Sequence, residues 1–205
     1  TTVVNGSDLI VTTGVGSEII TLSGQGSVSN ANVADNKAVT QNTLSLISSS
    51  GSASNYSMGT ITLNITQRPV NISLEKTYDG TLNAPASGLK SNGITNTVGG
   101  QTLTLSGTGL MQTTGVGVGK TISDNGSLSL GNGSGVASNY TIVGGNNIIE
   151  VTPRTTVASG SRYYDGTTTA NGTDFNTFTN VVGSDTITVS GFGSFSTAGV
   201  GSKSV

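Results

Sequence analysis

Short strings of residues return at long range along this chain, in the same order each time. The string Ala-Ser-Asn-Tyr at 53–56 returns at 137–140, which is 84 residues later. Tyr-Asp-Gly-Thr at 78–81 returns at 164–167 after 86 residues, and Val-Gly at 98–99 returns at 182–183 after 84. Ordered recurrence at nearly one spacing predicts a tandem array of similar units. The period is longer than the roughly 20–50 residues of solenoid repeats, so each unit is expected to own a core.

Two of the three prolines fall where one unit is expected to end and the next to begin. Pro69 and Pro153 lie 84 residues apart, each shortly after an alternating segment. Proline fixes φ and cannot donate a hydrogen bond to a sheet ladder, which suits a joint between units. We therefore predict a first unit at 1–68, a complete unit at 69–152 and a third unit at 153–205. The first and third are expected to be incomplete, as in a stretch of a longer protein.

Alternation of apolar and polar residues with a period of two predicts an all-β fold. In each alternating segment, one face carries Leu, Ile or Val and the other carries mostly hydroxyl side chains, as in antiparallel sheets with one dry face. We expect small antiparallel β-sandwich-like or β-grasp-like domains in an elongated array, and the sequence leaves the choice between the two open. The segments are 17–23, 43–46, 60–66, 102–106, 127–130 and 186–190.

Disorder is the alternative interpretation of a chain rich in Gly, Ser and Thr. Disordered chains usually combine low hydrophobicity with high net charge. Here the hydrophobic fraction is 33% and the net charge is −2, so the composition favours folded units.

Turn signals separate the alternating segments. Asn-Gly and Asp-Gly dipeptides tolerate positive φ and favour tight hairpins. Gly-x-Gly strings at 24–26, 107–109 and 191–193 are followed by no helical pattern, so we interpret them as strand bends or bulges instead of nucleotide-binding loops. The Asn-Gly and Asp-Gly dipeptides begin at Asn5, Asp79, Asn92, Asn125, Asn132, Asp165 and Asn171.

The residue inventory argues against catalysis. The chain has no Cys and no His, and its ten acidic residues are scattered without a close pair, so we expect no enzyme activity and no cofactor. We also expect no metal site. A calcium ion near Asp79 or Asp165 is the alternative to carboxylates that accept backbone N–H groups in turns. The absence of a basic patch and of an 18-residue apolar run predicts no nucleic-acid partner and no membrane insertion.

Four of the five tyrosines lie in the repeated strings. Either each ring fills the small core of its own unit with its hydroxyl bonded to a backbone partner, or the rings form a sugar-binding surface, and the first interpretation is favoured. We expect the signature residues to be structural, and none is expected to be catalytic. They are Tyr56, Tyr78, Asp79, Gly80, Tyr140, Tyr164, Asp165 and Gly166.

The strings Lys-Thr-Tyr-Asp-Gly-Thr at 76–81 and Tyr-Tyr-Asp-Gly-Thr-Thr at 163–168 resemble the opening motif of the YDG repeat. Strings at 182–187 and 198–201, with the Ala-Ser-Asn-Tyr strings, resemble its middle and end. The resemblance covers nearly all of 69–205 and the later part of 1–68. The first unit departs from the pattern, because no Tyr-Asp-Gly precedes Ser17.

The resemblance implies a large bacterial surface or secreted protein, such as a filamentous-haemagglutinin-like adhesin. We accordingly expect an extracellular stalk or filament segment that projects a binding tip or assembles into a fibre, in cell adhesion or biofilm. Its partners would be neighbouring repeats and identical chains that pair through open sheet edges. The alternative is a repeat module that itself binds glycans or a host protein. The family supplies no catalytic residues.

Overall fold

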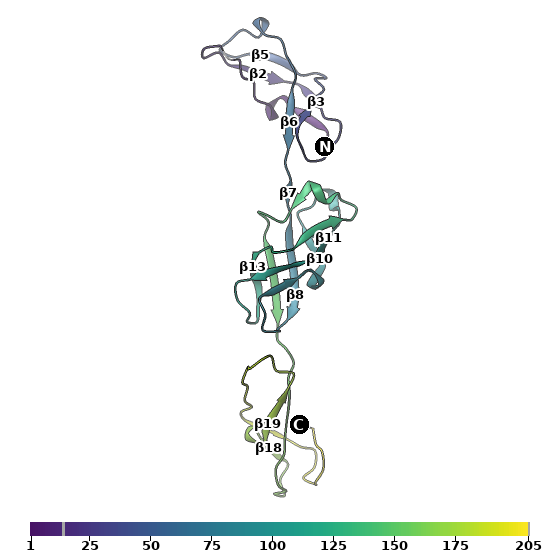
Figure 1. Ribbon diagram of the computed structural model, residues 1–205, viewed down its shortest axis with the longest axis vertical. Helices are drawn as coiled ribbons and strands as arrows, with labels where there is room; N and C mark the ends of the chain where they lie inside the picture. The colour runs from purple at the N-terminus through teal and green to yellow at the C-terminus, as the bar shows by residue number, and fades with distance from the viewer. Residues whose placement is uncertain (14, 205) are drawn as a thin grey trace. The chain divides into compact units, whose positions relative to one another are not determined.

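The computed structural model of this chain describes residues 1–13 and 15–204 and consists of β-strands joined by turns (Figure 1). Over these residues the only helical segments are six 3-10 turns of three residues each. The predicted all-β class is therefore confirmed. Within the same described ranges, no helix is long and apolar enough to cross a membrane.

The chain divides into two compact units, and each takes part of the middle repeat. The first unit comprises Thr1–Asn71, Ile94–Thr104 and Leu130–Gly145. The second comprises Ile72–Gly93, Leu105–Ser129 and Asn146–Val205. This division follows contacts in space, so it does not decide the sequence-based boundaries at 68/69 and 152/153, which stay predictions.

Antiparallel strand pairs enclose the N-terminal core of the first unit. They are β1 (Val3–Asn5) with β3 (Gln25–Ser27), β4 (Ala34–Ala38) with β6 (Thr62–Ile65), and β2 (Ile20–Ser23) with β5 (Ser45–Ser48). An antiparallel bridge between Ser27 and Thr40 connects the end of β3 to the segment after β4. The buried core residues are Val4, Val28, Val39 and Leu44.

A second core of the first unit forms around the start of the middle repeat. β7 (Arg68–Pro69) pairs in parallel with β15 (Tyr140–Thr141). Beside them, β11 (Leu103–Ser106) pairs with β14 (Ser129–Asn132). The buried members of this core are Val70, Leu103 and Tyr140.

The second unit contains a six-stranded mixed sheet in the order β10-β8-β16-β13-β12-β9. Its strands are β8 (Asn71–Thr77), β9 (Asn83–Pro85), β10 (Leu89–Thr95), β12 (Thr108–Met111), β13 (Gly117–Asp124) and β16 (Asn147–Thr152). Period-two burial is clearest in β16, where Ile149 and Val151 are buried and the residues between them are half-buried. In the neighbouring strand β8, fully buried Leu74 lies opposite Ile149, and fully buried Ile72 lies opposite Asn147.

Two strand pairs differ from the antiparallel pattern expected from alternation. β8 and β16 run in parallel from Ile72 opposite Asn147 to Thr77 opposite Thr152, and β7 and β15 are also parallel. In the sandwich architecture the sheets are antiparallel. β8, near the start of the middle repeat, and β16, at its end, thus lie side by side within one mixed sheet.

One strand pair with its 3-10 turn recurs in all three repeats. β1–β3, β9–β12 and β18–β20 pair antiparallel, with β18 at Thr169–Asn171 and β20 at Phe192–Ser194. In each pair a buried residue opposes the second glycine of a Gly-x-Gly string. The opposed residues are Val4 and Gly26, Ala84 and Gly109, and Ala170 and Gly193.

The Gly-x-Gly strings are bends, as predicted. The first glycine of each has a left-handed φ: +85° at Gly24, +87° at Gly107 and +85° at Gly191. A Cβ on Gly107 would lie 2.1 Å from the main-chain oxygen of Ser127, and one on Gly24 would lie 2.2 Å from that of Thr43. Gly24 and Gly107 therefore require glycine both for conformation and for close backbone approach, whereas Gly191 requires it for conformation alone.

Two sequence-based predictions of local structure are wrong. The segment 186–190 is not a strand, although its counterparts contain β2 and β11. Those two strands pair with β5 and β14, whereas residues 186–190 belong to no sheet. The Asn-Gly and Asp-Gly dipeptides also form no tight hairpins in the described ranges, because none of them joins two strands that pair with each other.

Candidate functional site in the Tyr-Asp-Gly turns

The first Tyr-Asp-Gly turn follows β8 and is closed around the carboxylate of Asp79. Asp79 Oδ1 accepts hydrogen bonds from the Thr81 backbone N–H and hydroxyl, both at 2.9 Å. Lys76 Nζ, three residues before the aspartate, donates to the same oxygen at 2.7 Å and to the Thr81 main-chain oxygen at 2.9 Å. Gly80 supplies the φ of +74° that lets the chain turn. The motif is therefore a self-contained charged turn.

The second turn repeats this geometry 86 residues later. Asp165 Oδ1 accepts from the Thr167 N–H and hydroxyl at 2.9 Å each, and Gly166 has φ of +75°. Arg162 takes the place of Lys76, with NH1 donating to Asp165 Oδ2 at 2.9 Å. Sequence reasoning missed this basic partner, although Lys76 and Arg162 are also separated by 86 residues.

The pKa values of the two carboxyl groups reflect these bonds. Partial burial raises the pKa of Asp79, but the Lys76 hydrogen bond, the two Thr81 bonds and the Lys76 charge outweigh it and lower the pKa to about 2. The backbone and side-chain bonds from Thr167 lower the pKa of Asp165, helped by the Arg162 charge. Since an ammonium group already neutralises Asp79, the carboxylate is bonded as a turn residue rather than offered to a cation.

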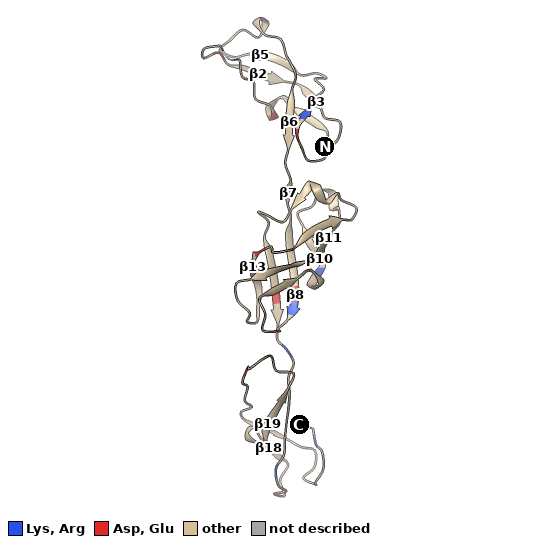
Figure 2. Cartoon of the chain, viewed as in Figure 1, with Lys and Arg blue, Asp and Glu red and all other residues tan. Residues whose placement is uncertain are grey.

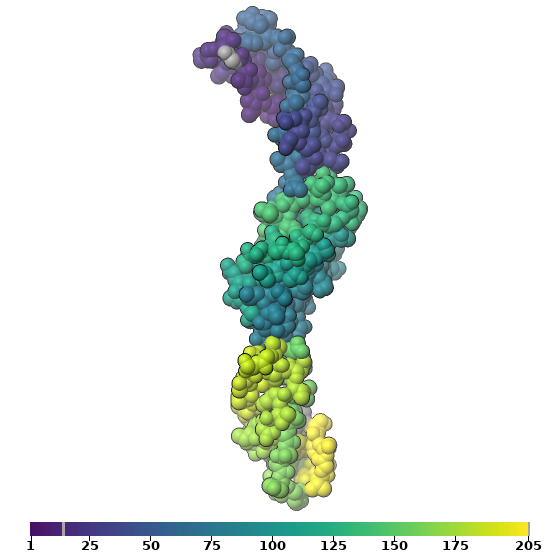
Figure 3. Space-filling view, viewed as in Figure 1, coloured from purple at the N-terminus to yellow at the C-terminus, as the bar shows by residue number. Residues whose placement is uncertain are grey.

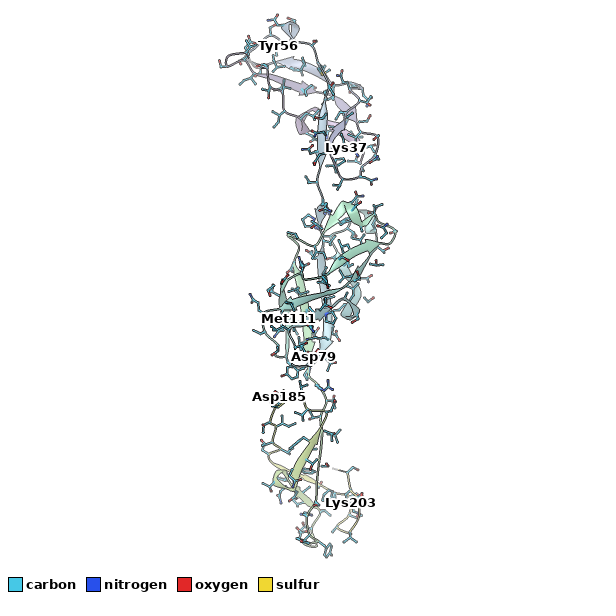
Figure 4. All side chains as sticks on the ribbon, viewed as in Figure 1. Lys37, Tyr56, Asp79, Met111, Asp185 and Lys203 are labelled. Carbon is cyan, nitrogen blue, oxygen red and sulfur yellow. The ribbon has the colours of Figure 1, made fainter. Side chains whose placement is uncertain are left out.

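The two turn tyrosines differ in environment. The Tyr78 hydroxyl donates to Asp185 Oδ2 at 3.0 Å, and the ring is half-buried. Tyr164 is 68% exposed. The hydrogen bond to Asp185, burial and the nearby Asp185 and Asp79 charges raise the pKa of Tyr78. Figure 4 labels Asp185 and, on the turn that carries Tyr78, Asp79.

The tyrosines of the Ala-Ser-Asn-Tyr strings bond side chains of their own repeats. Tyr140 is 4% exposed, and its hydroxyl donates to Gln101 Oε1 at 2.5 Å and accepts from the Val98 N–H at 3.1 Å. The Tyr56 hydroxyl donates to Glu18 Oε2, which raises the Tyr56 pKa together with burial and the Glu18 charge. Tyr140 therefore lies in a core and accepts a hydrogen bond from a backbone N–H, as predicted for all four repeat tyrosines. The prediction is wrong for the other three, because Tyr56 and Tyr78 donate to carboxylates and Tyr164 is exposed. The position of the side-chain acceptor recurs in the three repeats as Glu18, Gln101 and Asp185.

An arginine–asparagine pair lies beside each predicted joint. Pro69 is in β7, where its main-chain oxygen accepts from Asn96 Nδ2 at 2.7 Å while Arg68 bonds Asn96. Arg154, which follows Pro153, bonds Asn180 in the same way, and Asn180 Nδ2 donates to Thr155 O at 2.6 Å. The structural counterpart of Pro69 is therefore Thr155 and not Pro153. Sequence reasoning missed both asparagines, whose 84-residue spacing was the available signal.

Charged side chains are sparse (Figure 2), and two ion pairs, Lys76 with Asp79 and Arg162 with Asp165, join residues three apart in the sequence. Lys90 on β10 lies between acidic residues of the two next strands, with Nζ 2.5 Å from Glu150 Oε2 and 3.5 Å from Glu75 Oε2. In the described part of the chain, no three Asp, Glu, His or Cys side chains group as metal ligands would. The acidic residues thus support strands and turns.

An open cleft of about 570 Å³ lies in the third repeat, lined by 158–165 and by 197–203 among other residues. These two segments are yellow-green and yellow in Figure 3. Tyr163 and Tyr164 line it, and the Arg162 guanidinium lies 5.6 Å from the ring centre of Phe195. Its lining includes residues of β17 (Val157–Gly160) and Phe175, the first residue of β19 (Phe175–Thr179), with which β17 pairs.

These features define an all-β protein of tandem repeats, each repeat carrying the same bent strand pair. The chain belongs to the YDG domain family: residues 62–148 and 149–205, together more than half of its length, match the family model for the YDG domain. Comparison with curated proteins and with solved structures found no match.

Proposed function

We propose that this chain is a structural segment of an extracellular bacterial adhesin, in which the YDG repeats bear mechanical load or act as spacers and do not catalyse a reaction. The observation that carries the proposal is the recurrence of one strand pair, one 3-10 turn and one left-handed glycine in three successive repeats. Repetition of the parts that hold a fold together, with no repeated group of reactive side chains among the described residues, favours a scaffold role.

Mechanical unfolding of the 205-residue chain tests the scaffold role. A complete repeat of about 85 residues releases about 290 Å of extended chain, at roughly 3.4 Å per residue. Single-molecule extension is expected to show discrete steps, with the complete middle repeat close to this length. Gradual extension at low force without a discrete step would contradict the proposal.

Labelling of intact cells tests the extracellular location. Antibodies raised against the purified 205-residue chain are expected to bind intact cells of the source bacterium, and brief external protease treatment is expected to remove the signal. A signal that appears only after the cells are opened would overturn the location. The mechanical result would then stand alone.

A second candidate function is glycan binding in the third-repeat cleft. Tyr163 is 97% exposed and Tyr164 is 68% exposed, both line the cleft, and exposed aromatic surface marks interaction and ligand-binding sites. A glycan array probed with the chain tests this candidate. Binding lost in Tyr163→Ala and Tyr164→Ala but kept in Tyr78→Phe would favour it, and no binding by the parent chain would remove it.

A further inference from the structure

The Tyr-Asp-Gly turn of the middle repeat contacts a loop that belongs to the next repeat in the sequence. The Tyr78 hydroxyl donates to Asp185 Oδ2 at 3.0 Å, across 107 residues of chain and within the second compact unit. The Tyr78 hydroxyl is free to make this bond, because the internal hydrogen bonds of the turn involve Asp79, Lys76 and Thr81.

The glycine of the turn contributes to the same contact. A Cβ built on Gly80 would lie 2.7 Å from Val182 Cγ1, closer than real Cβ contacts. Val182 therefore occupies space that only glycine leaves free. Gly80 is therefore required for two reasons: it adopts a left-handed φ, and its lack of a side chain leaves room for the Val182 methyl group.

The contacted loop, residues 182–185, is itself built the same way in each repeat. In it the Asp185 N–H donates to the Val182 main-chain oxygen at 3.0 Å, and Gly183 has φ of +54°. The loop at 98–101 has the same bond, Gln101 N–H to Val98 O at 3.0 Å, and Gly99 has φ of +58°. Each loop begins with valine and ends with a side chain that accepts hydrogen bonds.

We propose that the Tyr-Asp-Gly turn is the element by which one YDG repeat recognises the next. The tyrosine hydroxyl bonds the acceptor that ends the loop of the following repeat, and the glycine receives the valine that begins it. The partner is thus a further copy of the loop at 182–185. This inference concerns contacts between repeats and holds wherever the protein is located.

The turn at Tyr164 presents the same surface for a loop of this kind. Its internal bonds match those of the first turn, Tyr164 is 68% exposed, and a Cβ on Gly166 would meet only the Tyr164 hydroxyl at 3.9 Å. The acceptor position can serve two tyrosines, because carboxylate and amide oxygens each carry two lone pairs. A repeat can therefore bond its own Ala-Ser-Asn-Tyr tyrosine and the preceding turn together.

Amide hydrogen exchange in the 205-residue chain tests the proposal. Tyr78→Phe and Gly80→Ala are each expected to speed exchange of the Asp185 amide roughly threefold to tenfold, since one net hydrogen bond or contact is lost. The matched controls are Tyr164→Phe and Gly166→Ala, which change the same motif with nearly the same φ but away from Asp185. Equal exchange at Asp185 in parent, variants and controls would overturn the proposal.

Tyrosine nitration gives a second readout that does not depend on glycine strain. In the 205-residue chain, Tyr78 is expected to react more slowly than Tyr164, and Asp185→Ala is expected to speed the reaction of Tyr78 alone. In a longer chain in which the third repeat is completed and followed by a further YDG repeat, Tyr164 is expected to become as slow as Tyr78. Rapid nitration of Tyr164 in that longer chain would refute recognition of the next repeat by the turn.

Discussion

Arg68 forms two hydrogen bonds to Asn96, with Nε donating to the main-chain oxygen and NH2 donating to Oδ1, each at 2.7 Å. Asn96 has a left-handed φ of +67°, and its Nδ2 donates a hydrogen bond to the main-chain oxygen of Pro69. The pair therefore ties β7 to the end of β10. Arg154 and Asn180, with φ of +63°, form the same tie in the third repeat.

We predict that Asn96→Ala lowers the free energy of unfolding by about 1–3 kcal/mol, because it removes bonds to a charged group and leaves a residue that disfavours positive φ. Asn96→Gly separates the two causes, since it removes the same bonds without the strain. Urea denaturation is expected to place Asn96→Gly between the parent and Asn96→Ala. Equal stability of Asn96→Ala and the parent would show that the tie contributes nothing.

Leu74→Ala is predicted to destabilise the second unit by about 2–5 kcal/mol, because Leu74 is fully buried in the six-stranded sheet and the substitution leaves a cavity. Val118→Ala is the control, since Val118 is 81% exposed and its loss is expected to stay within about 0.5 kcal/mol. Chemical denaturation followed by circular dichroism measures both. Similar losses in the two variants would contradict the assigned core.

Gly107→Ala and Gly191→Ala form a matched pair that separates conformational strain from steric contact. Both glycines have nearly the same φ, but only Gly107 is close to another backbone group. We predict about 1–2 kcal/mol of destabilisation from the left-handed φ in each variant. A further loss of about 1–3 kcal/mol is expected in Gly107→Ala alone, from overpacking against Ser127. Thermal unfolding that gives equal losses would argue against the close approach.

Low pH is predicted to lower the free energy of unfolding by protonating the two turn carboxylates, Asp79 and Asp165. The pKa of Asp79 is about 2 in the fold, against about 3.9 for an unfolded aspartate. A depressed folded pKa stabilises the fold above the unfolded pKa, and this contribution is lost as pH falls from about 4 towards 2. Asp165, whose pKa is also lowered, acts in the same direction.

Asp79→Asn checks the acid prediction. The variant is expected to be less stable than the parent at pH 6 and to lose less stability between pH 5 and pH 2, as measured by urea midpoints. An identical pH dependence in parent and variant would mean that the carboxylate contributes no linked stability.

The sequence predicted the parts of this fold that depend on local chemistry. Alternation located β2, β6 and β11, and the first glycine of each Gly-x-Gly string proved to be a bend. The parallel pairing of β8 with β16 could not be predicted, because alternation assigns residues to faces and says nothing about which distant strand lies alongside. Asn125-Gly126 shows a further limit: its local preference for a turn was correct, but the strands on either side pair elsewhere.

For the signature residues, spacing identified the tyrosines and the Asp-Gly turns but not their partners. The bond from Tyr78 to Asp185 joins side chains 107 residues apart, and the sequence alone offers no reason to match them. The arginines at the joints were equally hidden, because a single exposed cation has many potential acceptors. The 84-residue spacing of Asn96 and Asn180 marks them as a recurring pair, but spacing alone does not assign them to the arginines.

The parallel contact between β8 and β16 has a consequence for a chain pulled from its two ends. β8 lies near the start of the middle repeat, directly after β7, and β16 lies at its end. The two strands run in the same direction over six residue pairs, from Ile72 and Asn147 to Thr77 and Thr152. Tension then slides one strand along the other and loads their ladder in shear. The ladder hydrogen bonds must break nearly together, whereas a hairpin opened from one end releases them one at a time.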